Sequence, residues 1–587
     1  MEAWTPVSSD EEANTPVTEE IGWREWTRET FEEAAKTNRL VLLDLSAVWC
    51  HWCHVMDETT YSDSRIIRII NEQFIPVRVD IDRRPDISER YNRGGFPTTT
   101  FLSDRGEFVW GATYVPPQDM IKVLQAVLDA KASGEVDQAL ERGRMAYLDI
   151  SKAWEKRAIP DSEFVDAIFE DIFSAYDVEF GGFGLQQKFP QPNAIDLMLR
   201  RYSKDWDQEL AGAVENTLDR MAGGLYDREE GGVFRYSVTR DWREPHYEKM
   251  LETNIGFLKN AVHAFKILKR ERHADLARGT ASFIVKVLWG ADPGGFFGSQ
   301  DADEEYYKLS IKERSMRKAP AIDSSIYAGW NAEAVKAMIE AGALLGEENW
   351  VSAGRSAWEY SKEHLWNPDA GLVRHLEGNE VYLFEDQVSF LKSLIAILEI
   401  TNDPQLLPLA DSLVKSVERD FSSPEGGYVD VLKTNEAVGE LGSPRRSLMA
   451  NAEWAEAIAL LGGVSHNLDL TKKAWDTLQS FSRKDVEAHG VFAAPYVSAW
   501  WTLAQGPMVV EIHGSAQMDP MSIPLWLAAK EALNPAAVAV VARDETDSAA
   551  RHNGPFAVVC TSVGCSRGIT NADELKQKLR PVMANQI

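Results

Sequence analysis

A turn signal that recurs through the middle of the chain places the strongest constraint on how this sequence can fold. The signal is a pair of small residues, usually two glycines, followed by an apolar residue. Its second positions follow one another at intervals of 50, 63, 76, 56 and 63 residues, and each interval has room for two helices of ordinary length. The six occurrences are GGF at 181–183, GGV at 231–233, GGF at 294–296, AGL at 370–372, GGY at 426–428 and, more weakly, HGV at 489–491.

This repeat predicts a ring of helices over residues 161–505. A helix pair cannot bury its apolar faces alone, so successive pairs must stack, and six stacked pairs can close on themselves. We therefore expect an (α/α)6 toroid with inner helices around a central funnel, and glycines where the chain reverses between helices. An open helical array is the alternative.

Two regions that alternate between helix and strand patterns flank the predicted ring. Residues 23–132 predict a small α/β sandwich, and residues 506–587 predict a third, small α/β domain. Residues 133–160 are typical of a helical connector. The acidic, polar segment 1–22 has too little apolar content to fold, and we expect a mobile tail. The predicted architecture is multidomain, with α/β parts around an all-α centre.

Charge and cysteine content limit the partners and the compartment. The chain has 62 Lys and Arg against 91 Asp and Glu, and the net charge of −29 disfavours both nucleic acid and membrane surfaces. Its beginning lacks the basic and then apolar pattern of a signal peptide, so we expect a cytoplasmic location. The four cysteines form two close pairs, which in a reducing compartment indicate redox or metal chemistry.

The strongest local motif is WCHWC, which follows an apolar strand pattern and opens a helix. A helix N-terminus stabilises a thiolate, so Cys50 is the predicted nucleophile. Cys53 lies one helical turn further on, where it can resolve a mixed disulfide, and His51 adds a cation beside the thiolate when protonated. The second pair, Cys560 and Cys565, is most simply structural.

Two further residues fit a redox site. Asp44 stands six residues before Cys50 on the strand, where a buried acid can manage the proton of Cys53. Pro97, in GFPT, begins a later strand, and we expect a cis bond there that presents a backbone edge to the substrate. These features resemble the thioredoxin superfamily over residues 23–132.

Three other interpretations of the motif remain. CHWCH also satisfies the CxxCH pattern of covalent haem attachment, although the strand and helix context argues against it. Zinc on Cys50, Cys53 and His54 lacks an evident fourth ligand. The thiols of a thioredoxin-like scaffold can also be inert. We expect neither a cofactor nor a metal.

Polar residues gather beside the turns of the predicted ring, where loops at one end converge and can form a pocket. His246 with Asp301, Asp303 or Glu385 would supply an acid and base for sugar chemistry. The alternative is that such residues cap helices. The predicted substrate-binding residues are Tyr226, Arg235, His246, Glu248, Lys249, Asp301, Asp303, Trp330, Asn331, Glu385 and Asp386.

In order, WCHWCHVM, GGFG with KFP, FRYSVTRDWREPHYEKML, GSQDADEE, GWN and FEDQ resemble the thioredoxin-domain-containing family related to spermatogenesis-associated protein 20. The resemblance implies a thioredoxin-like domain joined to a toroid similar to six-hairpin glycosidases and N-acylglucosamine 2-epimerases. We interpret the chain as a thiol–disulfide oxidoreductase served by a thioredoxin-reductase-type or other dithiol partner, whose toroid binds a substrate or partner. The alternatives are a carbohydrate-active epimerase, isomerase or hydrolase that takes a sugar-like small molecule, and a non-catalytic ligand-binding or assembly protein.

Overall fold

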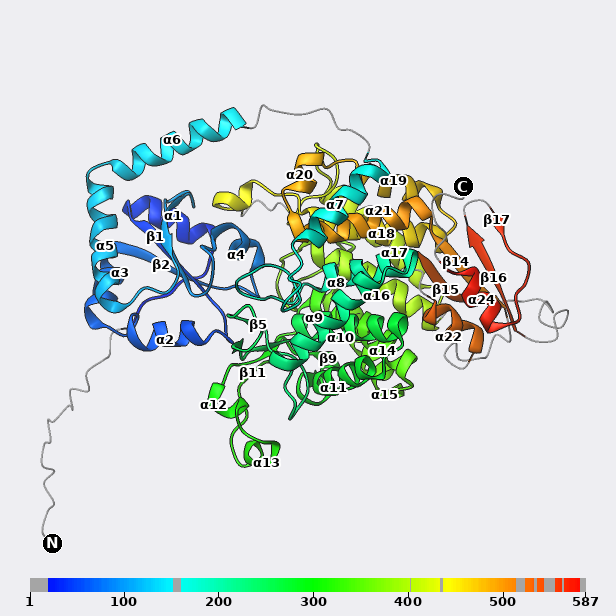
Figure 1. Cartoon of the computed structure of the whole chain (residues 1–587). Coiled ribbons are helices and arrows are strands. Elements are labelled where there is room, and N and C mark those ends of the chain that lie inside the picture. Colours follow the sequence, from blue (N-terminus) through cyan, green and yellow to red (C-terminus); the bar gives the residue numbers. More distant parts are fainter. Residues whose placement is uncertain are drawn as a thin grey trace, which may run out of the picture.

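The computed structural model describes a mostly helical chain with three parts in a row (Figure 1). A small α/β unit comes first, a ring of helices occupies the middle, and a second small sheet lies at the far end. The predicted tail falls almost entirely outside the described residues, as does the end of the predicted connector; the described part of the connector contains α6 (Glu135–Ile150). The described residues are 20–150, 160–401, 403–432, 437–513, 523–532, 536–542, 555–561 and 564–580.

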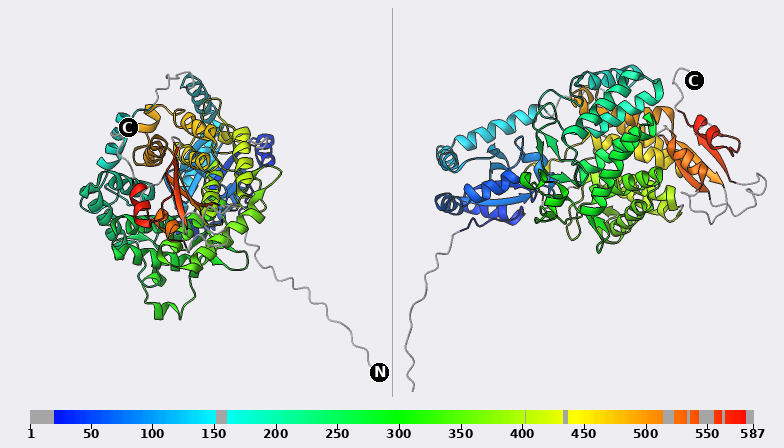
Figure 2. Two further views of the ribbon diagram at one scale, coloured as in Figure 1. Left: turned by 90° about the vertical axis from the view of Figure 1, so that its right-hand side faces the viewer. Right: turned by 60° about the horizontal axis from the view of Figure 1, so that its bottom comes forward.

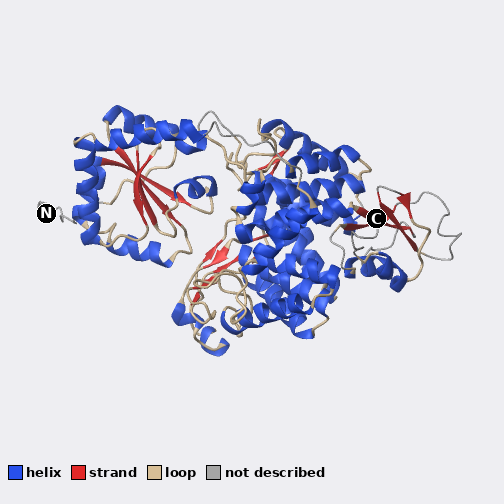
Figure 3. Ribbon diagram, turned by 45° about the horizontal axis from the view of Figure 1, so that its top comes forward, coloured by secondary structure: helices blue, strands red, loops and turns tan. Residues whose placement is uncertain are grey.

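The first unit is a four-stranded sheet in the order β2-β1-β3-β4, with helices on both faces (Figure 3). The central strand β1 pairs in parallel with β2 and antiparallel with β3. Alternate residues of β1 enter two separate apolar clusters, Val41 and Leu43 on one face and Leu40 and Leu42 on the other, so both faces are buried. The elements are α1 (Arg28–Thr37), β1 (Leu40–Ser46), α2 (His51–Thr59), α3 (Ser64–Gln73), β2 (Phe74–Asp80), α4 (Pro85–Tyr91), β3 (Thr98–Leu102), β4 (Phe108–Ala112) and α5 (Pro117–Ala132).

The middle part is a closed ring, as the turn repeat predicts. Each inner helix packs against the next, and α21 returns to α8, which excludes the open array. An outer helix covers each inner one. The inner helices are α8 (Pro192–Asp205), α10 (Leu251–Leu268), α14 (Ala328–Leu345), α16 (Phe384–Thr401), α18 (Leu448–Val464) and α21 (Ala494–Gln505). The outer helices are α9 (Gln208–Gly224), α11 (Glu271–Val287), α15 (Glu348–Tyr360), α17 (Leu406–Asp420), α19 (Leu468–Leu478) and α7 (Ser162–Ser174).

Buried side-chain amides tie the turns of the ring to its inner helices. In four units, the amide at the fourth position of the inner helix accepts a hydrogen bond from the backbone N–H of the residue that follows the turn, and donates one back to the carbonyl oxygen of that residue. Asn331 does so with Phe296, at 2.7 and 2.9 Å. The other three pairs are Asn254 with Val233, Gln387 with Val373, and Asn451 with Tyr428. Each clamp fixes a turn where the chain enters the inside of the ring.

Short elements on one side of the ring form the surface that meets the first unit. The two-stranded and three-stranded sheets and the bridges there carry the polar motifs named above. They include β5 (Tyr236–Ser237), β6 (Pro245–His246), β7 (Lys249–Met250), β10 (Ser299–Gln300), β11 (Ile322–Asp323) and the helices α12 (Glu304–Tyr307) and α13 (Ile311–Arg314).

The last part is a four-stranded sheet in the order β15-β14-β16-β17. It shares one buried apolar cluster with the ring, and its strands lie over the centre of the ring in an end-on view (Figure 2). Trp526 donates to the backbone oxygen of Glu399 at 3.1 Å, and Lys530 pairs with the carboxylate of Glu399 at 2.8 Å. Cys560 and Cys565 form a disulfide across β16 and β17. The elements are β14 (Met508–His513), α22 (Pro524–Glu531), β15 (Ala537–Ala542), β16 (Phe556–Thr561), β17 (Gly564–Cys565) and α24 (Ala572–Lys578).

Candidate redox site

The two cysteines of the WCHWC motif form a disulfide at the beginning of α2. Strand β1 ends at Ser46, and a short turn leads to Cys50, which is the N-cap of the helix. The backbone N–H of Cys53 donates to the Sγ atom of Cys50 at 3.2 Å. A donor aimed at this sulfur favours its thiolate when the disulfide is reduced.

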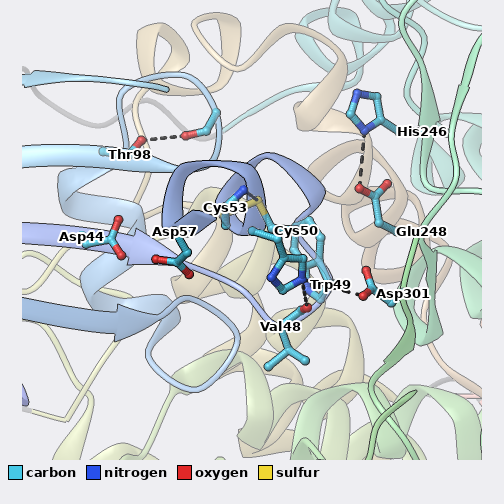
Figure 4. Close-up of a disulfide and its surroundings, with 12 residues drawn as sticks. Asp44, Val48, Trp49, Cys50, Cys53, Asp57, Thr98, His246, Glu248 and Asp301 are labelled. Atoms are coloured by element: carbon cyan, nitrogen blue, oxygen red, sulfur yellow. Dashed lines mark hydrogen bonds and ion pairs between the residues drawn. A yellow bond between two sulfur atoms is a disulfide. The ribbon is translucent and has the colours of Figure 1, made fainter. Parts of the chain in front are cut away.

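The toroid faces this disulfide across a cavity of about 280 Å³. Cys50 lines the cavity and is only 4% exposed. Figure 4 shows His246, Glu248 and Asp301 on the toroid side of the disulfide, with Asp44 on the opposite side. The first unit also contributes Trp49, His51, Trp52, Asn92, Gly94, Gly95 and Phe96, and the toroid contributes Gln187, Phe189, Arg235, Tyr236, His246 and Glu248.

Aromatic rings form one wall of this cavity, which we call the Cys50 cavity. Phe189 stacks on Tyr236 with ring centroids 4.4 Å apart, and Tyr236 stacks on His246 at 4.5 Å. The guanidinium of Arg235 lies 4.1 Å from the ring centroid of Trp49, a cation–π contact between the toroid and the residue next to Cys50. The wall is therefore built by both units.

Pro97 has the expected cis peptide bond, between Phe96 and Pro97. The proline is buried at the start of β3, and the hydroxyl of Thr98 donates to the backbone oxygen of Gly95 at 2.6 Å. Phe96 and Gly95 line the Cys50 cavity, so this turn borders the space beside the disulfide.

Asp44 is buried on β1 and forms an ion pair with Arg78, which the sequence pattern did not predict. Its Oδ2 atom lies 2.7 Å from Nε of Arg78, and the hydroxyl of Tyr61 donates to Oδ1 at 3.4 Å. Burial raises the pKa of Asp44 to about 6, although the charge of Arg78 opposes the rise. Asp44 therefore keeps its proton to a higher pH than an exposed aspartate does.

Direct contacts hold the thioredoxin-like unit against the toroid. The backbone N–H of Glu440 in the toroid donates to the hydroxyl of Tyr91 in the thioredoxin-like unit at 3.0 Å. The side chain of Arg90 is fully buried and pairs with the carboxylate of Asp430 in the toroid at 3.0 Å. Met250 of the toroid belongs to the same apolar cluster as Trp49 and the two cysteines. These contacts fix the position of the disulfide against the toroid.

A second cavity, of about 300 Å³, lies inside the ring and is called the lumen cavity here. It is lined by Trp330, Glu252 and Glu385 of the ring and by Asp82 of the first unit. The accessible surface of the Glu385 side chain faces this cavity, and the residue lies inside the ring. Burial raises the pKa of Glu385 to about 8, and neighbouring carboxylates add to the rise.

The four residues proposed for acid and base chemistry do not share one pocket, so that prediction is wrong. His246 lines the Cys50 cavity, whereas Glu385 lines the lumen cavity. Asp303 caps α12 by accepting the backbone N–H of Tyr306 at 2.9 Å, as the helix-cap alternative states. Asp301 lies 3.7 Å from Nε2 of His54. His246 lies in β6 and Asp301 directly follows β10, on the thioredoxin-like side, while Glu385 lies in the first turn of the inner helix α16.

In three other predicted binding residues, the polar groups already bond to other residues of the protein. The ammonium of Lys249 is buried against the carboxylate of Asp227 at 2.6 Å. Both amide atoms of Asn331 hold the backbone of a turn, so its amide is already satisfied. The carboxylate of Asp386 is buried and accepts the N–H of Gly329 at 2.9 Å.

Tyr226 and Trp330 lie apart from the Cys50 cavity. Tyr226 packs on Phe257, and its hydroxyl lies beside Gly279 of the outer helix α11. Trp330 lines the lumen cavity. Sequence reasoning left Phe189 and Asp82 out of the predicted site, although Phe189 stands in the KFP motif; Asp82 stands at no distinctive motif position. In the described part of the chain, no group of three or more His, Cys, Asp or Glu side chains is arranged to hold a metal ion.

A sheet with a CxxC disulfide and a cis-proline defines a thioredoxin-like unit, and the ring beside it defines a helical toroid. Residues 11–144 match the family model of DsbH-type thioredoxin-like proteins, described as a protein of unknown function, DUF255. The chain is similar to spermatogenesis-associated protein 20, as its motifs indicate: it is 30% identical to the mouse protein over 344 residues. That alignment covers 52% of this chain and 43% of the mouse protein, so the chain spans less than half the length of this relative.

Two further similarities cover single parts of the chain. Thioredoxin H7 of Arabidopsis thaliana is 28% identical over 102 residues, which are 17% of this chain and 74% of that protein. A solved structure of a D-mannose isomerase aligns at 11% identity with a TM-score of 0.45, and the alignment covers 59% of this chain and 100% of the isomerase. None of the described helices is long and apolar enough to cross a membrane.

Proposed function

We propose that this protein is a thiol–disulfide oxidoreductase whose working dithiol is Cys50 and Cys53. The observation that carries the proposal is the disulfide at the N-terminus of α2, with Cys50 lining a cavity that the toroid completes. In the reduced protein, the helix N-terminus favours the thiolate of Cys50, which attacks a substrate disulfide. Cys53 then attacks the Sγ atom of Cys50 and releases the reduced product.

The cycle requires an external electron donor. After each turnover the two cysteines are again joined, so a dithiol reductant has to reduce them by the same exchange. We propose a thioredoxin-reductase-type or other dithiol partner for this step. The second disulfide, Cys560 with Cys565, lies in the C-terminal sheet and takes no part in the proposed cycle.

The test is catalysis of disulfide reduction with dithiothreitol as the electron donor and hydroxyethyl disulfide as the substrate. Cys50→Ser is expected to abolish turnover, and Cys53→Ser is expected to accumulate a mixed disulfide at Cys50 that mass spectrometry detects. The double variant Cys560→Ser with Cys565→Ser is the matched control and is expected to keep the activity. Turnover that survives Cys50→Ser would refute the proposal.

A second proposal, for the toroid, is a carbohydrate-active role in the lumen cavity. The observation that favours it is Glu385, which faces that cavity with a pKa raised to about 8 by burial and so stays a proton donor near neutral pH. Trp330 in the same cavity offers an aromatic face for a sugar ring. Assays against a panel of mono- and disaccharides test it. Conversion that is equal in the wild type and in Glu385→Gln would refute this role of Glu385.

A further inference from the structure

The space beside Cys50 suits a small molecule better than a folded protein. The Cys50 cavity has a volume of about 280 Å³, close to the lower end of the range for small-molecule sites. Phe189 and Tyr236 of the toroid line it together with Gly95 and Phe96, the turn where a thioredoxin-like unit offers its docking edge. With the toroid in this position, the dithiol is covered on the side from which a protein substrate would approach.

One oxygen of a buried carboxylate in this cavity lacks a hydrogen-bond partner among the described residues. Glu248 is 2% exposed, and its Oε1 atom makes only a long contact of 3.4 Å with Nδ1 of His246. Its Oε2 atom has no hydrogen-bond partner among the described residues. A buried acceptor without a donor costs free energy, and a ligand ammonium would supply the missing donors.

A guanidinium in the same cavity has no hydrogen-bond partner in the described part of the chain. Arg235 stacks on Trp49, and its charge acts on the carboxylates of Asp82 and Glu252 without a direct hydrogen bond to either. A stacked guanidinium still offers its edge of N–H groups, which matches the two oxygens of a carboxylate. The Cys50 cavity therefore presents, beside the reactive sulfur, a guanidinium and a carboxylate oxygen that have no hydrogen-bond partner among the described residues.

We propose that the Cys50 cavity selects small disulfides that carry an α-amino-acid group, with the ligand ammonium on Glu248 and its carboxylate on Arg235. This inference rests on the proposed oxidoreductase function and names its substrate class. A zwitterion satisfies both groups at once, whereas a purely cationic or anionic ligand satisfies only one. Cystine is the simplest member of the class.

The proposed reaction balances as a two-electron exchange. The Cys50 thiolate attacks one sulfur of the substrate, so a Cys50–substrate disulfide forms, the substrate S–S bond breaks, and one half leaves as a thiolate that takes a proton from water. The Cys53 thiolate then attacks Cys50 and expels the second half. One substrate disulfide is reduced to two thiols while the Cys50–Cys53 pair is oxidised, and an external dithiol returns the electrons.

The test compares four disulfides as oxidants of the fully reduced protein. L-cystine carries both charges, cystamine only ammonium groups, dithiodiglycolate only carboxylates, and hydroxyethyl disulfide none. The rate constant for reforming the Cys50–Cys53 disulfide is followed by tryptophan fluorescence. We expect cystine to react at least about tenfold faster than hydroxyethyl disulfide, since a hydrogen-bonded ion pair contributes about 1.5 kcal/mol or more.

Two charge-removing variants separate the roles of the two groups. Glu248→Gln is expected to lower the rate constants for cystine and cystamine relative to that for dithiodiglycolate. Arg235→Gln is expected to lower the rate constants for cystine and dithiodiglycolate relative to that for cystamine. Glu305→Gln and Arg243→Gln, at side chains that are each 80% exposed, are the matched controls. Neither control should change the order of the four substrates.

The outcomes distinguish the inference from the function beneath it. Equal rates for all four disulfides, or faster reduction of insulin than of cystine, would overturn the substrate class and leave the oxidoreductase function standing. A reduced protein that none of the disulfides oxidises would overturn the oxidoreductase function itself. The comparison of substrates on the wild-type protein decides the matter even if a variant fails to fold.

Discussion

The imidazole of His375 joins the two main parts of the molecule: its Nε2 atom lies 2.6 Å from the backbone oxygen of Asp82, although 293 residues separate them. Its Nδ1 atom lies 3.0 Å from Oδ2 of Asp386. Because both neighbours are acceptors, both ring nitrogens must carry a proton, and His375 is held as an imidazolium. Burial opposes this charge, but the Asp386 carboxylate outweighs it, and the pKa of His375 is raised.

The first prediction concerns the pH dependence of stability. The folded protein holds the His375 proton more tightly than the unfolded chain, whose histidine pKa is about 6.5. The stabilisation is therefore complete below that value and is lost as the pH rises through the raised pKa of the folded state. Thermal midpoints between about pH 6 and 9 should fall more steeply for the wild type than for His375→Gln. His364→Gln, at a surface histidine, should retain the wild-type slope; equal slopes for all three proteins would contradict the prediction.

The second prediction concerns Glu385 in the lumen cavity. Its pKa is raised to about 8, so the folded state holds this proton far more tightly than the unfolded chain. Stability then declines as the pH rises from the unfolded glutamate pKa of about 4.3 to about 8, because over this range only the unfolded chain releases the proton. Glu385→Gln removes the ionisation, and its thermal midpoint should rise relative to that of the wild type between about pH 5 and 8 and keep a constant difference above about pH 8. The exposed Glu363→Gln is the control, and a constant difference across pH would count against the prediction.

The third prediction concerns the amide clamps of the ring. Asn331→Ala leaves the buried N–H and carbonyl groups of Phe296 without their partner. The expected loss is about 2 to 4 kcal/mol in the free energy of unfolding, measured by urea denaturation. Asn193→Ala removes an amide that makes one long bond of 3.4 Å to Glu453 and should cost less than about 1 kcal/mol. Similar losses in the two variants would show that the clamp is unimportant.

The fourth prediction concerns Asp44 behind the disulfide. Arg78 holds the pKa of Asp44 down against the larger effect of burial, which leaves it at about 6. In Arg78→Gln the pKa of Asp44 should rise above that value, as measured by the carboxyl carbon shift in NMR titration. Arg65→Gln, whose side chain is 65% exposed and pairs with Asp63, should not alter it. An unaltered Asp44 pKa in Arg78→Gln would mean that the pair does not control this acid.

Local patterns were sufficient to predict the elements that bury apolar surface. The first four residues of the run, Leu40 to Leu43, are all apolar, and they form a strand buried on both faces. The turn repeat predicted a ring because each glycine pair marks one reversal, and Gly182 shows why glycine is needed: it has a φ of +70°, and a Cβ there would lie 2.5 Å from the ring of Trp242. The cis bond before Pro97 likewise followed from a local motif.

Features that depend on distant partners could not be predicted in the same way. The helix Pro85–Tyr91 is polar, without an apolar stripe, and the burial of its Arg90 depends on distant partners in the toroid, the carboxylate of Asp430 and the backbone oxygen of Glu440. Asp303 and Glu385 resemble each other in sequence, as acids beside turns, yet one caps a helix and the other faces a cavity. The clamp amides all stand at the fourth position of their helices. This pattern is hard to see in the sequence, because the segments between each turn and its helix differ in length.

The thioredoxin-like unit covers one end of the ring, and the C-terminal sheet covers the other. For a molecule bound in the lumen cavity, entry and departure then depend on the movement of a cover rather than on diffusion to an open surface. Its association rate should level off as its concentration rises, at the rate constant for opening. Its residence time should be long even at modest affinity, so a physiological ligand should survive purification and be recoverable by denaturing the protein.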